Sequence, residues 1–343
     1  MTEFIKINTN QPEKEILEKA AGRLHAGELV SFPTETVYGL GAIATDAHAA
    51  EKIYRAKGRP SDNPLIIHIA EPEDAERYAF VSPLYKKLAK AFMPGPLTVI
   101  LPKRDNIPMS VTGGLDTVAV RCPSHPVARE LIRTTGGALA APSATLSGSP
   151  SPTCAMHVRK DLEGRVDMIL DGGICEIGLE STIVKLDGEK ITLLRPGAVT
   201  YDALCCVAPY VEIAEAVTHA LSEDEKPLSP GMKYRHYAPS APLVLLDGDE
   251  DCVLHYMRHM QNVERCAIIC YEEDLPYLRY EHVISIGRRD DLVAQANALF
   301  SALRKTDEME VDAVFAPLPP KEGLGLALYN RMIRAAAHTV QKV

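Results

Sequence analysis

The chain has 343 residues, of which 46% are hydrophobic and 24% charged, so it is long enough to bury a sizeable core in about two domains. Its 37 basic and 46 acidic residues give a net charge of −9, which argues against a protein that coats nucleic acid by charge alone. No apolar run approaches the roughly 18 residues of a membrane span, and no signal-peptide pattern is visible, so a cytoplasmic location is expected. The eight cysteines lack CxxC spacing and indicate mostly buried thiols.

Residues 1–210 predict a mixed α/β domain. Apolar residues at helical spacing predict helices over 12–25, 47–56, 83–92, 126–134 and 155–162. Short apolar runs predict strands over 29–32, 65–69, 97–101, 118–121, 168–170, 181–186 and 191–194. The last two strands follow each other so closely that they suggest an antiparallel pair.

Residues 211–241 are predicted to be a linker, because the stretch 222–241 holds three prolines and little periodicity. The pattern changes in residues 242–343. Strands predicted over 243–246, 266–270, 282–286 and 313–315 alternate with helices over 251–260, 292–305 and 324–337. This alternation is typical of a Rossmann-like parallel sheet and predicts a second, smaller domain.

A polar turn follows the first predicted strand, which runs into Pro33. The turn carries the hydroxyls of Thr34 and Thr36. Gly39 and Gly41 then free the backbone, and with Ala44 they formally match a dinucleotide fingerprint. Six residues separate that match from the strand it should directly follow, so we do not read it as a cofactor site.

A second polar segment follows the helix predicted over 47–56. Gly58 stops that helix and Pro60 forbids its resumption, which leaves Lys57 in the last turn. The residues after it are expected to be extended, and alternation would aim three side chains the same way: Arg59, Ser61 and Asn63. His68 is the polar interruption of the next apolar strand. Each residue taken alone could be ordinary structure, but the set suits an anionic, polar ligand.

Three further groups of polar residues stand beside apolar strands. Thr117 and Arg121 bound one strand, where an arginine could hold a carboxylate or form a structural ion pair. The small-residue stretch 140–153 could admit a ligand to the backbone or be a mobile loop. Ser181 and Arg195 stand at two other strand boundaries. Hydroxyls, amides and cations without paired catalytic carboxylates favour a phosphate-transfer reaction that is catalysed by positioning and electrostatics. Any divalent ion is expected to arrive bound to nucleotide phosphates.

These motifs together closely resemble the two-domain threonylcarbamoyl-AMP synthases, whose catalytic part is a YrdC-like domain. The resemblance rests on Lys57-x-Arg59-x-Ser61-x-Asn63 and on PTETVYGLG, PGPLT, TVAVR, ESTI and LLRPG in the expected order. It implies an N-terminal YrdC-like twisted mixed sheet with helices, followed by a smaller Rossmann-like domain. The linker segment SPGMKYRHYAP resembles one that folds over the active site in the two-domain form. One departure is Thr145, which stands where the family usually has asparagine.

The resemblance implies a nucleotidyltransferase that condenses L-threonine, bicarbonate and ATP to L-threonylcarbamoyladenylate and pyrophosphate. The product supplies the threonylcarbamoyladenosine modification next to the tRNA anticodon. Mg²⁺ would accompany the ATP phosphates, with no metal ligand from protein side chains. A hand-over of the product to the tRNA threonylcarbamoyl transferase machinery would follow.

The same resemblance assigns roles to individual residues. The catalytic residues would be Lys57 and Arg59. ATP would be bound by Arg59, Asn63, Thr117, Ser143, Ser151, Arg195 and the linker residue Tyr234. L-threonine would be bound by Thr34, Thr36, His68, Arg121, Ala141 and Ser181.

Two other classes of function compete with this interpretation. An RNA-binding module could use a concave polar surface, although the net acidity, the 6% aromatic content and the absence of tryptophan count against it. A non-catalytic sensor of nucleotide or threonine would bind without releasing pyrophosphate. The role of the C-terminal domain does not follow from its pattern, because fold alone does not decide function.

Overall fold

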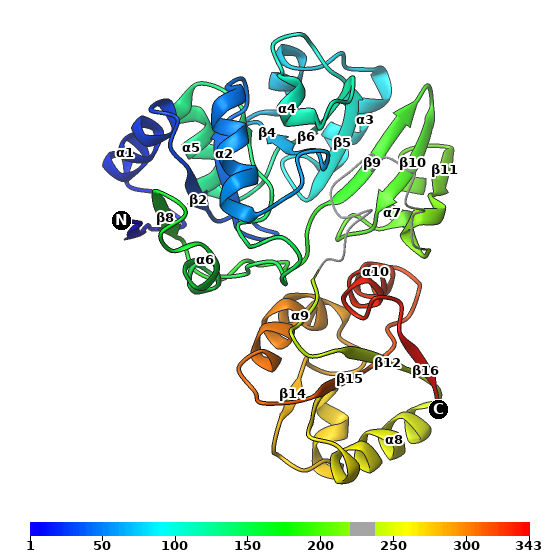
Figure 1. Ribbon diagram of the computed structural model, residues 1–343. Coiled ribbons are helices and arrows are strands. Elements are labelled where there is room, and N and C mark those ends of the chain that lie inside the picture. Colours follow the sequence, from blue (N-terminus) through cyan, green and yellow to red (C-terminus); the bar gives the residue numbers. More distant parts are fainter. Residues whose placement is uncertain (220–236) are drawn as a thin grey trace. The chain divides into compact units, whose positions relative to one another are not determined.

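The computed structural model describes residues 1–219 and 237–343, and these divide into two compact units (Figure 1). Most of residues 1–219 form the first unit. Residues 237–343 form the second, together with two short segments of the preceding chain, Gly148–Pro150 and Ile177–Leu179. None of the helices in the described ranges has both the length and the apolar composition needed to cross a membrane.

The first unit is a mixed α/β domain, as the sequence predicts. Its helices are α1 (Lys14–His25), α2 (Ala47–Lys57), α3 (Pro83–Phe92), α4 (Met109–Thr112), α5 (Pro126–Thr135), α6 (Ala155–Leu162) and α7 (Tyr201–Cys205). Its strands are β1 (Glu3–Lys6), β2 (Val30–Phe32), β3 (Gly39–Ile43), β4 (Ile66–His68), β5 (Leu97–Pro102), β6 (Thr117–Arg121), β7 (Leu139–Ala140), β8 (Met168–Asp171), β9 (Thr182–Asp187), β10 (Lys190–Arg195) and β11 (Tyr210–Ile213). Two 3₁₀ helices, Pro72–Arg77 and Glu215–Val217, complete it.

These strands form one twisted sheet in the order β1-β8-β2-β3-β7-β4-β6-β5-β9-β10-β11. The sheet contains both parallel and antiparallel neighbours, and β9 and β10 are antiparallel, as predicted. The apolar faces of α1 and α5 pack into one buried cluster with β2 and β8, while α2, α3 and α6 contribute to another. Helices therefore bury both faces of the sheet around its centre.

Four strands of this sheet escape sequence-based prediction for identifiable reasons. β3 contains glycines, which are typical of loops, and β7 has only two residues. Strand β1 is a half-exposed edge, and β11 is mostly exposed. Because β11 pairs with β10, the sheet runs three residues past the expected domain boundary at residue 210.

The segment after α2 corrects one expectation. Gly58 caps the helix with φ 60°, as predicted, but the following residues form a turn in which the N–H of Asn63 donates to the carbonyl of Pro60 (3.3 Å). A turn does not alternate, so Ser61 is exposed while Arg59 and Asn63 are buried. The prediction of an extended segment with three side chains on one side is therefore wrong.

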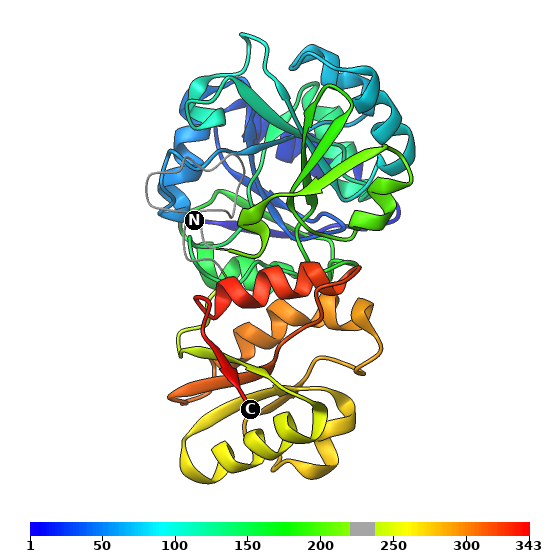
Figure 2. The ribbon, with the colours of Figure 1, turned by 90° about the vertical axis from the view of Figure 1, so that its right-hand side faces the viewer.

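The second unit is a parallel α/β sheet, also as predicted. Its strands are β12 (Leu243–Asp247), β13 (Cys266–Cys270), β14 (Val283–Ser285), β15 (Ala313–Pro317) and β16 (Val340–Lys342), in the order β14-β13-β15-β12-β16. Its helices are α8 (Glu250–Val263), α9 (Leu292–Thr306) and α10 (Gly325–Ala335), with a 3₁₀ turn over Glu272–Tyr277. Figure 2 shows α8 on one face of this sheet and α9 with α10 on the other.

Candidate active site

A pocket in the first unit lies at one edge of the large sheet. In this part of the sheet the strands run in both directions, which brings the ends of β4, β6 and β10 and the starts of β5 and β9 to the same edge. The residues that stand at those positions are therefore brought together although they are far apart in sequence. Eight predicted site residues line the pocket: Thr34, Arg59, His68, Arg121, Ala141, Ser143, Ser181 and Arg195.

A row of polar side chains beside this pocket crosses β4, β6 and β5 and ends at Ser181, the residue before β9. His68 on β4 lies opposite Arg121 on β6, and Arg121 lies opposite Thr98 on β5. The hydroxyl oxygens of Thr98 and Ser181 are 2.7 Å apart. Because register partners project from the same face of a sheet, the row presents a ring nitrogen, a guanidinium and two hydroxyls to one side.

Arg195 closes this row from the end of β10. Its Nε donates to the carbonyl oxygen of Ser181 (3.0 Å), and its Nη2 donates to the Ser181 hydroxyl (3.1 Å). The nearby Gly197 allows this close approach, since a Cβ there would lie 2.6 Å from the backbone nitrogen of Thr182. The LLRPG and ESTI motifs thus meet because one glycine has no side chain.

The two cations at the C-terminal end of α2, Lys57 and Arg59, are held by backbone carbonyls. The Nζ of Lys57 donates to the carbonyls of Ser143 (2.6 Å) and Thr145 (2.5 Å). The Nη2 of Arg59 donates to the carbonyl of Pro64 (3.0 Å), and its Nε donates to that of Asn63 (3.3 Å). These hydrogen bonds reduce the side-chain freedom of both cations, which is what catalysis by positioning requires.

The turn after β2 is organised by the hydroxyl of Thr34. That hydroxyl accepts from the N–H of Thr36 and of Val37 (both 3.2 Å) and donates to the Val37 carbonyl (2.6 Å). The hydroxyl oxygens of Thr34 and Thr36 are 2.9 Å apart. Across the pocket, the N–H of Ala141 donates to the carbonyl of Ile66 (2.9 Å), which fixes the small-residue stretch along β4.

Arg121 forms a buried ion pair that the sequence interpretation did not include. Its Nη2 lies 2.8 Å from a carboxylate oxygen of Glu35, and the two side chains are 5% and 4% exposed. The sequence left open whether Arg121 holds a ligand carboxylate or a structural partner. The structure shows the ion pair with Glu35, and the Arg121 side chain also lines the pocket.

His68 is a neutral imidazole in this setting. Burial, reinforced by the positive charge of Arg121, lowers the pKa of His68 to about 3. Its Nδ1 lies 3.3 Å from the carbonyl oxygen of Ile66. A neutral ring has one donor and one acceptor nitrogen, so His68 is suited to hydrogen bonding rather than to holding a positive charge.

Five other predicted residues do not line the pocket, and four of them contact residues that do. Thr36 contacts Thr34, Lys57 contacts Ser143, the Asn63 carbonyl contacts Arg59, and the Ser151 hydroxyl donates to the pocket residue Glu180. Thr117 stands at the opposite end of β6 from Arg121, where it pairs with Pro102. Tyr234 lies outside the described residues.

Sequence reasoning missed three polar residues of the site: Glu35, Thr98 and Glu180. Each lies inside a motif that carried the family resemblance, namely PTETVYGLG, PGPLT and ESTI. The signal was therefore present, but only neighbours of Glu35 and Glu180 were selected, and no residue of PGPLT was.

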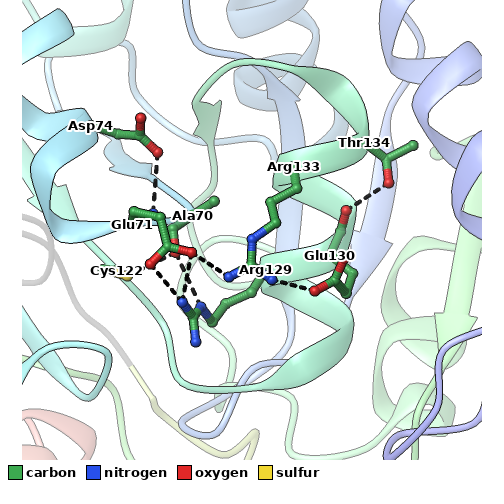
Figure 3. Close-up of polar contacts among 8 residues, drawn as sticks. All are labelled: Ala70, Glu71, Asp74, Cys122, Arg129, Glu130, Arg133 and Thr134. Atoms are coloured by element: carbon green, nitrogen blue, oxygen red, sulfur yellow. Dashed lines mark hydrogen bonds and ion pairs between the residues drawn. The ribbon is translucent and has the colours of Figure 1, made fainter.

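A separate polar cluster lies outside this pocket. The carboxylate of Glu71 accepts from the Nη2 of Arg129, with 2.8 Å to each oxygen, and pairs with Arg133 (Figure 3). The Nε of Arg129 also donates to the carbonyl of Ala70 (3.1 Å). Hydrogen bonding from Arg133 is the main factor that lowers the pKa of Glu71. None of these residues was predicted to be functional.

Comparisons with known proteins agree with this architecture. A family model described as Telomere recombination matches residues 23–197, and one described as Threonylcarbamoyl-AMP synthase, C-terminal domain, matches residues 200–337. A relative from Bacillus subtilis named threonylcarbamoyl-AMP synthase is 45% identical over 338 residues, which covers 98% of this chain and 96% of the relative. A relative of the same name from Pyrococcus abyssi is 43% identical, covering 94% of this chain and 95% of the relative.

A solved structure shows the same resemblance in three dimensions. The crystal structure of P. abyssi Sua5 complexed with L-threonine matches with a TM-score of 0.92 and 42% identity, and the match covers 100% of both chains. The chain therefore belongs to the threonylcarbamoyl-AMP synthase family, as an ATP-using enzyme of the nucleotidyl-transfer type.

Proposed function

We propose that this chain condenses L-threonine, bicarbonate and MgATP to L-threonylcarbamoyladenylate and pyrophosphate at the pocket of the first unit. The observation that carries the proposal is the presence of three arginines, Arg59, Arg121 and Arg195, in one small pocket with hydroxyls and a neutral imidazole. Membership of the family supports it, as does the P. abyssi relative crystallised with L-threonine.

The chemistry has two steps. The amino nitrogen of L-threonine and bicarbonate give N-carboxythreonine and water. A carbamate oxygen then attacks the α-phosphorus of ATP, the bond from that phosphorus to the β-phosphate bridging oxygen breaks, and pyrophosphate leaves with the electron pair. A carbamate oxygen is a weak nucleophile, so positioning and charge stabilisation contribute most of the rate enhancement.

The cations suit the phosphate end of this reaction. Lys57 and Arg59 are the proposed catalytic residues, and with Arg195 they hold the phosphates and spread the transition-state charge. The carbonyls of Ser143 and Thr145 hold the ammonium group of Lys57 in place. Further ATP contacts are assigned to Asn63, Thr117, Ser143, Ser151 and Tyr234.

The other end of the pocket suits the amino acid. Arg121 binds the threonine carboxylate with help from Ser181, while Thr34, Thr36, His68 and Ala141 contact the amino-acid and carbamate groups. A neutral His68 can donate to or accept from these groups without adding charge. Carbamates decompose readily in water, so the linker around Tyr234 is assigned the role of a lid that excludes water.

Mg²⁺ enters as part of the MgATP substrate. Residues 1–219 and 237–343 contain no group of three or more His, Cys, Asp or Glu side chains that could hold a metal ion. The phosphate oxygens of ATP are oxygen ligands of the kind that Mg²⁺ prefers. The product would pass to the tRNA threonylcarbamoyl transferase machinery, and a cytoplasmic location stays a prediction.

Pyrophosphate release tests the proposal. The purified chain would be incubated with ATP, magnesium, bicarbonate and L-threonine, with each omitted in turn and the adenylate identified by mass. Release that requires both L-threonine and bicarbonate is expected. Binding of ATP or L-threonine without turnover would favour a sensor instead. If the chain showed neither binding nor turnover, the RNA-binding module would be favoured.

A further inference from the structure

Glu35 is a buried carboxylate that pairs with the pocket residue Arg121, and the reaction scheme above gives it no role. It is 4% exposed, and both of its carboxylate oxygens are enclosed without a hydrogen bond among the described residues. A carboxylate in such a position costs free energy unless a positive charge compensates it. Arg121, 2.8 Å away, supplies that charge.

Arg121 is itself incompletely bonded. Its Nε and Nη2 are enclosed and make no hydrogen bond within the described part of the chain, because the short contact with Glu35 lacks hydrogen-bond alignment. A guanidinium has five N–H donors and can serve two carboxylates from different edges. The same Arg121 side chain also lines the pocket.

Two carboxylates would therefore share one guanidinium when an amino acid binds. We propose that Glu35 is a resident counter-ion of Arg121, which competes with the substrate carboxylate and so sets the affinity for L-threonine. The proposal rests on the proposed function, specifically on Arg121 as the carboxylate anchor. Like charges close together in a poorly solvated site repel strongly, so Glu35 weakens the binding of a carboxylate that Arg121 attracts.

The substitution Glu35→Gln isolates this effect. Glutamine keeps the shape and an oxygen acceptor for Arg121 but removes the negative charge. The control is Glu71→Gln, which makes the same chemical change in a carboxylate whose arginine partners, Arg129 and Arg133, do not line the pocket. Calorimetry would measure the Kd of L-threonine and of L-threonine amide, which lacks the carboxylate.

Glu35→Gln is expected to lower the Kd of L-threonine by about tenfold, equivalent to about 1.4 kcal/mol, and to leave that of the amide unchanged. Glu71→Gln should change neither. A folded Glu35→Gln protein with an equal or higher Kd for L-threonine would overturn the proposal. If wild-type protein bound the amide as tightly as L-threonine, the carboxylate anchor in the proposed function would fail, and the role of Glu35 would fail with it.

If Glu35→Gln is too unstable for calorimetry, the shift in Tm on ligand binding provides a second test. Loss of the counter-ion leaves Arg121 buried and unpaired, so a bound carboxylate should compensate it. The rise in Tm with saturating L-threonine should be larger for Glu35→Gln than for wild type. The rise with L-threonine amide should be the same for the two proteins. An equal rise with both ligands would overturn the proposal.

Discussion

Arg195 and Ser181 are joined by two hydrogen bonds, from Nε to the Ser181 carbonyl (3.0 Å) and from Nη2 to the Ser181 hydroxyl (3.1 Å). That hydroxyl is also 2.7 Å from the hydroxyl of Thr98. The end of β10, the residue before β9 and the start of β5 are therefore connected through side chains as well as through the sheet. Arg195 is thus held rigidly where the proposed function needs a phosphate-binding cation.

Arg195→Lys tests this rigidity. Lysine keeps the charge but is a single flexible point donor, so it does not reproduce the planar fork on Ser181. We expect pyrophosphate release to fall by about tenfold, corresponding to the loss of about one charge-assisted hydrogen bond, with KM for ATP raised. The control is Arg265→Lys, at an exposed ion pair with Asp312 in the second unit, which should change neither constant. If the two variants had equal kinetic constants, the proposed role of Arg195 in binding the phosphates would be wrong.

Arg121→Met separates the binding role of Arg121 from its structural role. KM for L-threonine should rise far more than KM for ATP, because the carboxylate anchor is lost. Glu35 would remain buried without its counter-ion, so the free energy of unfolding should fall by about 3–5 kcal/mol.

The double variant Arg121→Met, Glu35→Gln provides the matched control for stability. It should recover part of the lost stability without recovering L-threonine binding, because the unpaired charge is gone but the anchor is still missing. Urea unfolding and steady-state kinetics would measure the two effects. Equal rises in KM for both substrates would contradict the assignment of Arg121 to the carboxylate.

Thr145 occupies the position where the family usually has asparagine, and the structure explains what it contacts. Its hydroxyl donates to the carboxylate of Asp161 on α6, and its carbonyl accepts from Lys57. Thr145→Val keeps the shape but removes the hydroxyl, so it should loosen the loop that holds Lys57 and lower kcat about tenfold. Thr145→Ser keeps the hydroxyl and should retain most of the activity. If valine and serine gave the same kcat, Asp161 would have no part in positioning Lys57.

The lowered pKa of His68 predicts that the stability of the folded protein depends on pH. Its pKa is about 3 in the folded protein, compared with an ordinary value of 6.5 for histidine, because burial and Arg121 disfavour the imidazolium. Between those values the unfolded chain binds the proton and the folded protein does not, so stability should fall as pH drops from about 6.5 towards 3. His125, whose pKa burial also lowers, contributes in the same direction.

Urea unfolding at pH 8 and at pH 5 would measure this effect. His68→Gln should reduce the difference in unfolding free energy between the two pH values, because the titrating group is gone. His255→Gln, at an exposed position on α8, is the control and should leave the difference as in wild type. An unchanged difference for His68→Gln would show that His68 is protonated in the folded state.

The sequence by itself determined the elements whose hydrophobic period is strong and long. It predicted α3 and α6 with their observed bounds, because local apolar spacing specifies which face of each helix is buried. It also predicted the antiparallel pair β9 and β10, because the connection between them is short. It also identified Arg59, Arg121 and Arg195, since these cations interrupt or bound apolar segments within specific motifs.

Tertiary structure alone decided the rest. The turn at 60–63 leaves Ser61 exposed and Asn63 buried. The strand order brings Thr98 of β5 beside Ser181. No local pattern in the sequence specifies either arrangement. The pairing of Glu35 with Arg121 joins residues far apart in sequence. Side-chain period and propensity are local properties, whereas strand order and the partners of buried charges depend on long-range packing, so only the folded chain defines them.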